Sequence, residues 1–556
     1  MLSRSTSARP RLRRLRWFAL LLAWMSSGFL APDAHAEDAD RPFEVRLRSR
    51  QPLQADANQY RVVEKSESWK PNETAIIVCD VWDLHHCLNA VLRVKEMAPT
   101  IERVLKTARK QGALIIHAPS DCMDNYKNHP GRKRAIETPK SSNLPADIGK
   151  WCYKIPSEEK GTYPIDQSDG GEDDDTQEHQ QWAEQLSAMG RNPKSPWKSE
   201  TNMLTIGDAD YISDKGDEIW SVLEVRGIRN VILLGVHTNM CILGRPFGLR
   251  QLAKNGKNVV LMRDMTDTMY NPARAPFVSH YAGTDLIIEH IEKFVCPTIT
   301  SDQILGGHPF RFKADPRPRA ALVVAEDEYK TDETVPVFAS AQLIKDYYLD
   351  YILASDRDRN SLPSINLLEK ADTALISVRR RVLPTEQVEA LKRFVASGKG
   401  IVGIRTASHA FSPRANEPVP EGHSSWDGFD AEVLGGNYRG HHDEGSNVKV
   451  TVAKDGAEHP ILEGVDAGKL EGHGTLYKVN PLVATAKPLL IGAIPDHPEE
   501  PIAWTNAPPS GNRVFYTSLG HPGDFASPDF QKLLRNAFEW TTANHHSRTP
   551  ASTGTE

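Results

Sequence analysis

The sequence lacks the features of several protein classes. Its formal net charge of −6 is small for 556 residues, and no basic stripe runs along it, which argues against a nucleic-acid partner. Beyond residue 36, no stretch approaches the roughly 20 apolar residues that a membrane span requires. No two cysteines are spaced as CxxC, so the spacing of a zinc site is also missing. We therefore predict a soluble mature chain with no membrane span and no nucleic-acid partner.

Cysteine is absent from the second half of the chain. The six cysteines are Cys79, Cys87, Cys122, Cys152, Cys241 and Cys296. In an exported protein some of them could form disulfides, but the sequence does not say which would pair. Because none follows Cys296, any cysteine chemistry must belong to the first half.

The N-terminus has the pattern of a signal peptide. Four arginines between positions 11 and 16 precede the apolar run from Trp17 to Leu30, and Ala34-His35-Ala36 follows. A basic start, a short apolar core and small residues at a cleavage site are typical of export signals. We predict that residues 1–36 are removed and that the mature protein is periplasmic or secreted.

Short apolar runs alternate with helix-length amphipathic stretches in two successive parts of the chain. This pattern predicts an α/β fold with two doubly wound, three-layer domains, each built on a parallel sheet covered on both faces. The expected strands are 74–80, 112–118, 230–236 and 258–264, then 320–326, 373–378, 400–406, 488–493 and 512–518. The expected helices include 100–112, 217–228 and 384–400.

The domain boundaries follow from the same pattern, because a chain of this length exceeds what one core usually supports. The first domain is predicted over 37–299 and the second over 319–543. Residues 300–318 contain several Gly and Pro and show no period, as expected of a linker. Residues 544–556 are expected to form a disordered tail.

An acidic segment, "DQSDGGEDDDTQE" (166–178), interrupts the first domain. Such a run is usually a solvated loop. Clustered carboxylates are also calcium ligands, but their spacing here matches no standard calcium loop. We predict no cofactor, because no spacing in the sequence supports a divalent metal.

Two strand ends in the first domain carry residues suited to nucleophilic catalysis. Asp80 ends one predicted strand and Cys241 follows another, and sites in doubly wound sheets lie at the carboxyl ends of strands. A carboxylate beside a thiol can accept its proton, and backbone N–H groups of a following helix can stabilise an oxyanion. In the alternative interpretation, Asp80 caps a turn and Cys241 only fills space.

The flanking residues resemble the isochorismatase-like cysteine hydrolases over roughly 70–299. The similar segments are "IIVCDVWDLHHC" (76–87), "RGIRNVILLGVHTNMCI" (226–242) and "GKNVVLMRDMTDTM" (256–269). The resemblance implies a Cys–Asp–Lys site, in which Cys241 attacks an amide-like carbon and Asp80 takes the thiol proton. It also implies a cis peptide bond within 236–239. Isochorismatase itself lacks the nucleophile, so the presence of Cys241 favours hydrolysis of amides, imides or carbamoyl compounds.

The residues around the nucleophile complete this expectation, with one departure. Met240, His237 and Asn239 would form the wall of the site and the oxyanion region. The lysine that the family places about thirty residues before the cysteine falls near Asp208 here. Lys198 and Lys215 are the nearest replacements, although both also read as solvated surface lysines.

Histidines near the expected site are ambiguous. Some relatives bind a metal through an Asp-x-His and a second histidine, whereas His117, Asp121 and His129 here have a different spacing. His85 and His86, like His237, could assist proton transfer or form structural hydrogen bonds.

The second domain resembles the ThuA-like trehalose-utilisation family over roughly 319–543. The segments that carry the resemblance are "GIRTASHAF" (403–411), "WDGFDAEVLGGNYRGHH" (426–442), "AEHPIL" (457–462), "PIAWTN" (501–506) and "NRVFYTSLGHPGDF" (512–525). By this analogy Arg405, His409, His442 and His521 would line a polar ligand pocket. Thr475 stands where the family usually has a glutamate, which weakens an acid–base role.

Three hypotheses follow. The first is an exported hydrolase that cleaves a small C–N bond through Cys241 and Asp80, fused to a domain with a carbohydrate-like ligand. The second is a carbohydrate-binding protein whose hydrolase domain has decayed, as the missing lysine suggests. The third places catalysis on keto-sugars in the second domain. The expected partners are a small amide-like substrate and a carbohydrate ligand, and a homo-oligomer is compatible with all three.

Overall fold

A computed structural model describes residues 41–442 and 447–546 of the chain, with side chains as far as 543. The predicted signal peptide (1–36) lies outside the described residues. Of the predicted tail, residues 544–546 complete the last helix and 547–556 lie outside the described part. Within the described ranges, no helix is long and apolar enough to cross a membrane.

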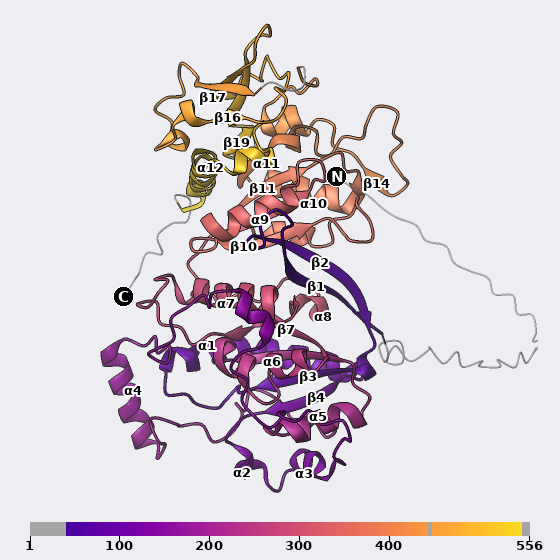
Figure 1. Cartoon of the computed structure of the whole chain (residues 1–556), viewed down its shortest axis with the longest axis vertical. Coiled ribbons are helices and arrows are strands. Elements are labelled where there is room, and N and C mark those ends of the chain that lie inside the picture. The colour runs from indigo at the N-terminus through magenta and orange to yellow at the C-terminus, as the bar shows by residue number, and fades with distance from the viewer. Residues whose placement is uncertain (1–40, 443–446, 547–556) are drawn as a thin grey trace, which may run out of the picture.

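The first half folds around an eight-stranded sheet in the order β2-β1-β8-β7-β6-β3-β4-β5 (Figure 1). The strands from β3 to β8 pair in parallel, whereas β1 runs antiparallel to β2 and β8. The strands are β1 (Phe43–Pro52), β2 (Tyr60–Trp69), β3 (Thr74–Cys79), β4 (Leu114–Ala118), β5 (Tyr211–Ile212), β6 (Asn230–Val236), β7 (Asn258–Asp267) and β8 (Thr298–Ile299).

Helices cover both faces of this sheet. One apolar cluster holds side chains of α5, α6 and α7, and the other holds those of α1. The helices are α1 (Leu88–Lys110), α2 (Met123–Tyr126), α3 (Pro130–Glu137), α4 (Thr176–Ala188), α5 (Gly216–Val225), α6 (Leu249–Lys254), α7 (His280–Phe294) and α8 (Asp302–Leu305), with short turns η1 (Pro71–Glu73), η2 (Pro156–Lys160) and η3 (Thr238–Ile242). Because the sheet is covered on both sides, β3 and β6 are buried throughout and apolar after their first residues, Thr74 and Asn230.

The second half contains a nine-stranded sheet in the order β10-β9-β11-β13-β19-β18-β17-β15-β16. Its first five strands are parallel and the other four antiparallel. The strands are β9 (Arg319–Ala325), β10 (Tyr348–Leu353), β11 (Thr373–Val378), β13 (Gly400–Ile404), β15 (Val448–Val452), β16 (Glu471–Gly472), β17 (Lys487–Ala493), β18 (Glu500–Asn506) and β19 (Val514–Thr517), and β12 (Leu383–Pro384) pairs separately with β14 (His423–Ser424). The helices are α9 (Thr331–Gln342), α10 (Thr385–Ala396), α11 (Pro522–Phe525) and α12 (Pro528–His546), with short turns η4 (Ile365–Lys370), η5 (Arg405–His409), η6 (Asp430–Leu434), η7 (Pro460–Leu462) and η8 (Ala467–Lys469).

The predicted α/β class is confirmed, and the apolar runs from the sequence form β3, β4, β6, β7, β9, β11, β13, β17 and β19. The prediction of parallel sheets holds for only one side of each sheet. Antiparallel strands extend the first sheet beyond β8 and the second beyond β19. The first long helix also begins at Leu88 rather than at residue 100, since Pro99 lies inside it instead of marking its start.

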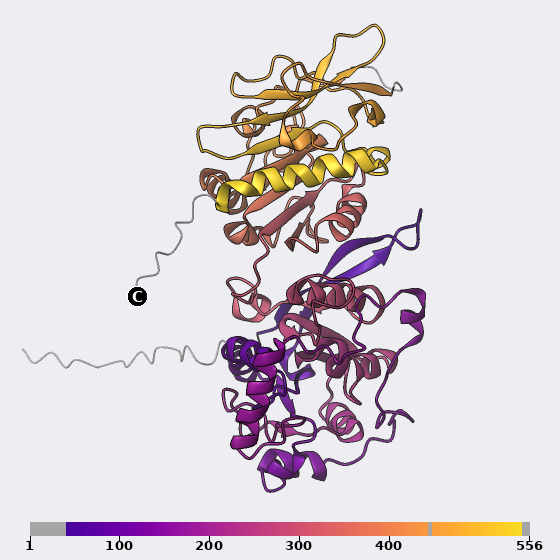
Figure 2. The same cartoon turned by 90° about the vertical axis from the view of Figure 1, so that its left-hand side faces the viewer.

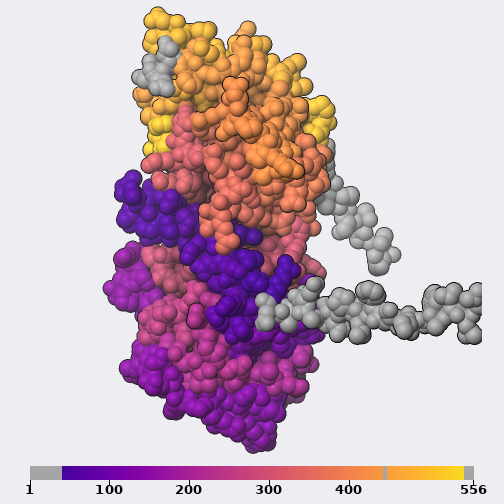
Figure 3. Space-filling model, turned by 90° about the vertical axis from the view of Figure 1, so that its right-hand side faces the viewer, coloured from indigo at the N-terminus to yellow at the C-terminus, as the bar shows by residue number. Residues whose placement is uncertain are grey.

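The β1–β2 hairpin links the two halves (Figure 2). Val62 of β2 belongs to an apolar cluster of the second half, and Asp356 accepts hydrogen bonds from the backbone N–H and the hydroxyl of Ser66 at 3.0 and 2.7 Å. Figure 3 shows these indigo strands at the waist of the molecule. The N-terminal hairpin therefore completes the core of the C-terminal half.

Candidate active site

The two residues predicted to catalyse lie at the ends of neighbouring strands. Asp80 directly follows β3, and Cys241 lies in η3, which follows β6. The two strands pair in parallel with Cys79 opposite Gly235. A Cβ on Gly235 would lie 2.0 Å from the carbonyl oxygen of Cys79, and the φ of this glycine is +125°, so no other residue fits there without strain. The close strand pairing brings Asp80 and Cys241 to the same edge of the sheet.

Asp80 is fully buried and has a partner for each carboxylate oxygen. Oδ1 accepts a hydrogen bond from the backbone N–H of Ser120 at 2.7 Å, and Oδ2 accepts one from Nε of Arg245 at 2.9 Å. The Arg245 guanidinium also lies 5.4 Å from the centre of the Trp151 ring. Asp80 adopts a φ of +53°, a conformation that non-glycine residues adopt rarely and mostly where surrounding contacts enforce it.

Cys241 lies within the electrostatic influence of this ion pair. Burial raises the pKa of its thiol well above the ordinary value, and the charge of Asp80 raises it further, whereas Arg245 lowers it. Its Sγ is 3.5 Å from Nδ1 of His237, whose own pKa is lowered to about 3 mainly by burial. At neutral pH the thiol therefore keeps its proton and faces a carboxylate and a neutral imidazole.

The structure brings neither of the two predicted lysines to this pair. Lys198 is exposed, and its backbone N–H donates to Oδ1 of Asp83. The side chain of Lys215 is 58% exposed and pairs with Asp214. The cation next to Asp80 is Arg245, four residues after Cys241. This spacing of one helical turn was the signal in the sequence that could have identified Arg245. It was missed because the cation was sought only before the cysteine.

The bend before Cys241 also differs from the expectation. The peptide bonds within 236–239 are trans, and His237 makes the bend by adopting a left-handed conformation with φ of +62°. The Met240 N–H donates to the carbonyl of His237 at 2.9 Å. The Asn239 side chain donates to Gln167 and to the carbonyl of Met269. These groups stabilise the loop, and their hydrogen-bonding capacity is largely used within the protein.

A cavity of about 610 Å³ opens beside the segment that contains Cys241. Met240 and Asn239 line one side of it, and its other walls include Trp151, Tyr153, Tyr163 and Gln167. Its volume is typical of a small-molecule site. Because Trp151 lies against Arg245 and Met240 directly precedes Cys241, the cavity adjoins the Asp80–Arg245–Cys241 group.

One wall of the cavity is ionic. Glu158 accepts two hydrogen bonds from Arg250, both at 2.7 Å, and lies 2.8 Å from Nε2 of His290. Burial opposes ionisation of Glu158, but the hydrogen bonds from His290 and Arg250 lower its pKa to about 2. Nδ1 of His290 is buried and has no hydrogen-bond partner. The cavity thus combines aromatic faces with a fixed charge pair.

On the other side of Asp80 there is little space. A hollow of about 10 Å³ lies between Asp80, Trp82, His85 and His237, enough for about one water molecule. Trp82 stacks on Trp197 with centroids 4.6 Å apart, and the rings of His85 and His237 are 4.8 Å apart. This packing closes the site on the α1 side.

The histidines that the sequence offered as metal ligands, His117 and His129, have separate structural roles. His117 is buried between Glu200, at 2.8 Å, and Asp210, at 3.1 Å. Although burial opposes it, the charge of Glu200 and the hydrogen bond to Asp210 raise the pKa of His117 to about 9. His129 caps α3 by accepting from the Gly131 N–H, and Asp121 lies at the surface beside Arg245. His117 is thus held in an internal ion network.

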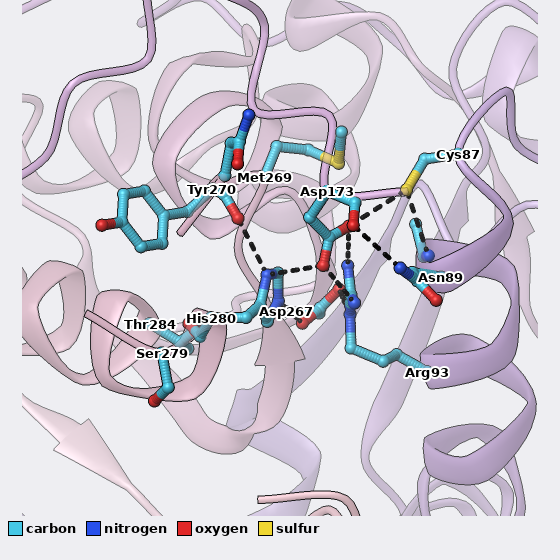
Figure 4. Close-up of polar contacts among 12 residues, drawn as sticks. Cys87, Asn89, Arg93, Asp173, Asp267, Met269, Tyr270, Ser279, His280 and Thr284 are labelled. Atoms are coloured by element: carbon cyan, nitrogen blue, oxygen red, sulfur yellow. Dashed lines mark hydrogen bonds and ion pairs between the residues drawn. The ribbon is translucent and has the colours of Figure 1, made fainter. Parts of the chain in front are cut away.

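The acidic segment is attached to the sheet by Asp173 (Figure 4). Arg93 makes two hydrogen bonds to Asp173, at 2.8 and 3.1 Å, and donates a third to Asp267 at 2.8 Å. His280 contacts both carboxylates, at 3.2 and 2.9 Å. Burial opposes ionisation of Asp173, but His280 and Arg93 lower its pKa well below the usual range. This part of the segment is therefore anchored, which the expectation of a solvated loop did not include.

In the second half, Arg405 and His409 lie in η5 at the end of β13. Arg405 has a φ of +42°, and its guanidinium lies 4.1 Å from the Tyr329 ring and 4.9 Å from the Tyr477 ring. His409 stacks on Tyr438 with centroids 4.5 Å apart. Burial and then the charge of Arg380 lower the pKa of His409 to about 3, so His409 is neutral.

The other two predicted pocket residues lie elsewhere. Nε2 of His442 is 3.2 Å from Glu500, and the His442 ring lies 4.7 Å from that of His497. His521 caps α11 by accepting from the Gly523 N–H. Neither lines the cavity of about 490 Å³ that contains His409, and Arg405 does not line it either. That cavity also includes Arg380, Asp430, Asn437 and Tyr438. The sequence reasoning missed them because it considered mainly histidines, and because Arg380 lies about 50 residues before the other three.

Comparison with protein-family models gives a match in the second half of the chain. Residues 320–541 match the family model described as ThuA, trehalose utilisation, which confirms the resemblance predicted for that segment. A comparison with curated proteins gave no match.

Solved structures similar to parts of the chain include members of both families named from the sequence motifs. A ThuA-like protein from Bacteroides uniformis is 20% identical, with 42% of this chain and 95% of that chain covered and a TM-score of 0.32. A cysteine hydrolase from Pseudomonas syringae pv. phaseolicola is 16% identical, with 43% and 95% covered and a TM-score of 0.26. An isochorismatase family protein from Burkholderia thailandensis is 14% identical, with 42% and 93% covered and a TM-score of 0.23.

Proposed function

We propose that the first half of the chain hydrolyses the C–N bond of a small amide, imide or carbamoyl compound, with Cys241 as nucleophile. The observation that carries the proposal is the position of the Asp80–Arg245 ion pair, which lies at the same sheet edge as Cys241 and acts on its thiol. An adjacent general base and a nearby positive charge are two ways in which a thiol nucleophile is activated, and Asp80 and Arg245 offer both.

The proposed reaction has two steps, acylation of Cys241 and hydrolysis of the acyl-enzyme. Sγ of Cys241 attacks the carbonyl carbon while its proton passes to Asp80, and the departing nitrogen takes that proton as the C–N bond breaks. Water then attacks the thioester and gives a proton to Asp80, which returns it to the sulfur. Because the free thiol is protonated, proton transfer to Asp80 is coupled to attack, and Arg245 offsets the negative charge that builds up nearby.

The cavity beside Met240 is the expected substrate site. Its aromatic walls, Trp151, Tyr153 and Tyr163, favour a flat or ring-shaped substrate. Cys241 itself is 5% exposed, so the substrate has to displace a neighbour to reach the sulfur. Met240 is partly buried and lines the cavity, and its unbranched side chain is the one best able to move.

The test is a substrate panel of amides, ureas and imides, with the parent chain and Cys241→Ala compared. The parent should turn over at least one class, and the variant should fall to the uncatalysed rate. Cys296→Ala is the matched control, because Cys296 is also buried but lies outside the site. Equal turnover by the parent and Cys241→Ala would refute the proposal.

In the second candidate function, the second half binds a carbohydrate or processes a keto-sugar, and the first half has lost its catalytic activity. The burial of Cys241 and its raised thiol pKa favour a decayed hydrolase. The cavity around His409 offers an aromatic face, Tyr438, beside the charged Arg380 and Asp430, a combination suited to a sugar ring and its hydroxyls. Tyr438→Ala should weaken sugar binding to the full chain at least tenfold. Unchanged binding would count against this candidate.

Export of the chain is compatible with both candidate functions. Periplasmic or secreted location remains a prediction from residues 1–36, and a homo-oligomer is compatible with both candidates. Fractionation of cells that express the full chain would test export directly.

A further inference from the structure

A second group of titratable side chains lies outside the Cys241 site, where three segments meet. The segments are the turn before α1, the acidic stretch before α4, and the first turn of α4. Nδ1 of His179 lies 3.4 Å from Oε1 of Glu172 and 3.4 Å from Oδ2 of Asp174. Nε2 of His86 lies 3.3 Å from the other oxygen of Glu172. The group thus contains two imidazoles and two carboxylates.

The spacing of these atoms fits metal ligands better than direct ion pairs. Charge-assisted N–H···O contacts are usually about 2.7–2.9 Å long, and none of these contacts is that short. Zinc bonds to nitrogen or oxygen of about 2.0–2.1 Å, arranged tetrahedrally, place neighbouring ligand atoms roughly 3.3–3.4 Å apart. One ligand atom from each of Glu172, Asp174 and His179 also lies within 4.8 Å of the other two. A single ion can therefore contact all three.

One oxygen in the group is aimed at His179 without a hydrogen-bond donor. Oε1 of Glu172 is buried and accepts no hydrogen bond, and it lies 3.4 Å from Nδ1 of His179. A buried carboxylate oxygen without a donor is costly in a native protein. A cation at this point would satisfy it.

The surrounding residues hold the ligands in place. Oδ1 of Asp174 accepts hydrogen bonds from the Asn89 N–H at 2.8 Å and the Cys87 thiol at 3.3 Å. Oδ2 accepts one from the Leu88 N–H at 2.7 Å, and this oxygen, which faces His179, keeps a second lone pair. Asp173 is fixed by Arg93 and His280 (Figure 4). Such outer contacts orient metal ligands and add to affinity. The side chains of Glu172 and His179 are 26% and 40% exposed, so an ion can enter from solvent.

We propose that Glu172, Asp174 and His179 bind a divalent transition-metal ion of the zinc type, with His86 next to the open coordination position. Nitrogen from imidazole selects such ions over calcium, which requires six to eight oxygen ligands. The site does not depend on hydrolysis at Cys241, and none of its ligands contacts Asp80 or Arg245 among the interactions of the described residues.

The experiment uses the full chain, purified without a histidine tag and stripped with a chelator. Zn²⁺ binding is measured by calorimetry, and Co²⁺ is added separately to record its visible spectrum. The variants are His179→Ala and Glu172→Gln. Glu178→Gln is the matched control, because Glu178 is an exposed neighbour in α4 and loses the same charge. Circular dichroism checks that each variant is folded.

The parent and Glu178→Gln should bind one Zn²⁺ per chain and produce the intense visible absorption of low-coordinate Co²⁺. His179→Ala and Glu172→Gln should each lose at least about tenfold in Zn²⁺ affinity. Equal affinity in all four proteins, or no binding by the parent, overturns the proposal. Calcium that displaces Zn²⁺ at equal concentration overturns the assignment to a transition metal.

Discussion

Replacement of Arg245 by glutamine isolates the effect of the cation on Cys241. Arg245 lowers the pKa of the Cys241 thiol and Asp80 raises it. Arg245→Gln should therefore raise the thiol pKa further, whereas Asp80→Asn should lower it. At a fixed pH below the pKa, the thiolate fraction should fall in the first variant and rise in the second.

The expected magnitudes follow from burial. The side chains of Arg245 and Asp80 are 18% and 0% exposed, and loss of one partner of a buried pair costs about 3–5 kcal/mol. Because Arg245 reaches some solvent, we expect about 3 kcal/mol, or a fall of roughly 6–12 °C in the melting temperature of this half. The double variant should lose less stability than the two single variants lose in sum, since it leaves no unpaired charge. A change of one unit in thiol pKa changes the thiolate fraction about tenfold.

The assay is alkylation by iodoacetamide between pH 6 and 10, read by mass spectrometry on the peptide that contains Cys241. Cys296 in the same digest is the internal control, because it is buried and its raised pKa arises from burial rather than from Asp80. The ratio of the two alkylation rates removes any general loosening of the fold. Asp80→Asn should alkylate faster than the parent yet lose turnover, because the proton acceptor is gone.

If both variants shift the Cys241-to-Cys296 ratio in the same direction, or leave it unchanged, the Asp80–Arg245 pair does not control the pKa of the Cys241 thiol. Strictly additive losses of melting temperature in the double variant would show that Asp80 and Arg245 do not interact in solution.

Three other predictions follow from the described contacts. The folded pKa of His117 is raised to about 9, so protonation of His117 stabilises the fold by up to about 3 kcal/mol. This contribution is complete below about pH 6.5 and is lost as pH rises through 9. Urea unfolding of the parent should show this loss of stability, and His117→Gln should not. Met240→Trp should fill part of the cavity beside Cys241 and raise KM for amide substrates several-fold with less change in kcat, and an unaltered KM would place the substrate elsewhere. Gly235→Ala should lower the melting temperature by more than 5 °C, because its Cβ would clash with Cys79; a neutral effect in calorimetry would contradict this.

Much of the fold could be predicted from the sequence because its signals are local. Buried parallel strands such as β3 and β6 are continuous apolar runs, and apolar periodicity identifies the helices between them. The β1–β2 hairpin was missed because its strands carry many charged residues whose partners, such as Asp356 for Ser66, lie almost 300 residues away. The antiparallel edge of the second sheet was missed for a similar reason, since pairing direction depends on contacts between distant segments.

The site was predictable only in part. The meeting of Asp80 and Cys241 follows from strand order, which alternating patterns suggest. The identity of the cation does not, because one helical turn after η3 delivers Arg245 to a carboxylate 165 residues earlier. His442 and His521 show the opposite limit. Like His409, each lies in a segment that resembles the ThuA-like family, but the fold places them next to Glu500 and at the start of α11.

Acid quenching during turnover of a substrate from the amide panel, followed by mass spectrometry of the Cys241 peptide, tests directly whether Cys241 becomes acylated. The proposed mechanism predicts an acyl group on Cys241 in the parent and a greatly diminished adduct in Asp80→Asn. Product formation without any mass added to Cys241, at a rate that Cys241→Ala matches, would contradict it.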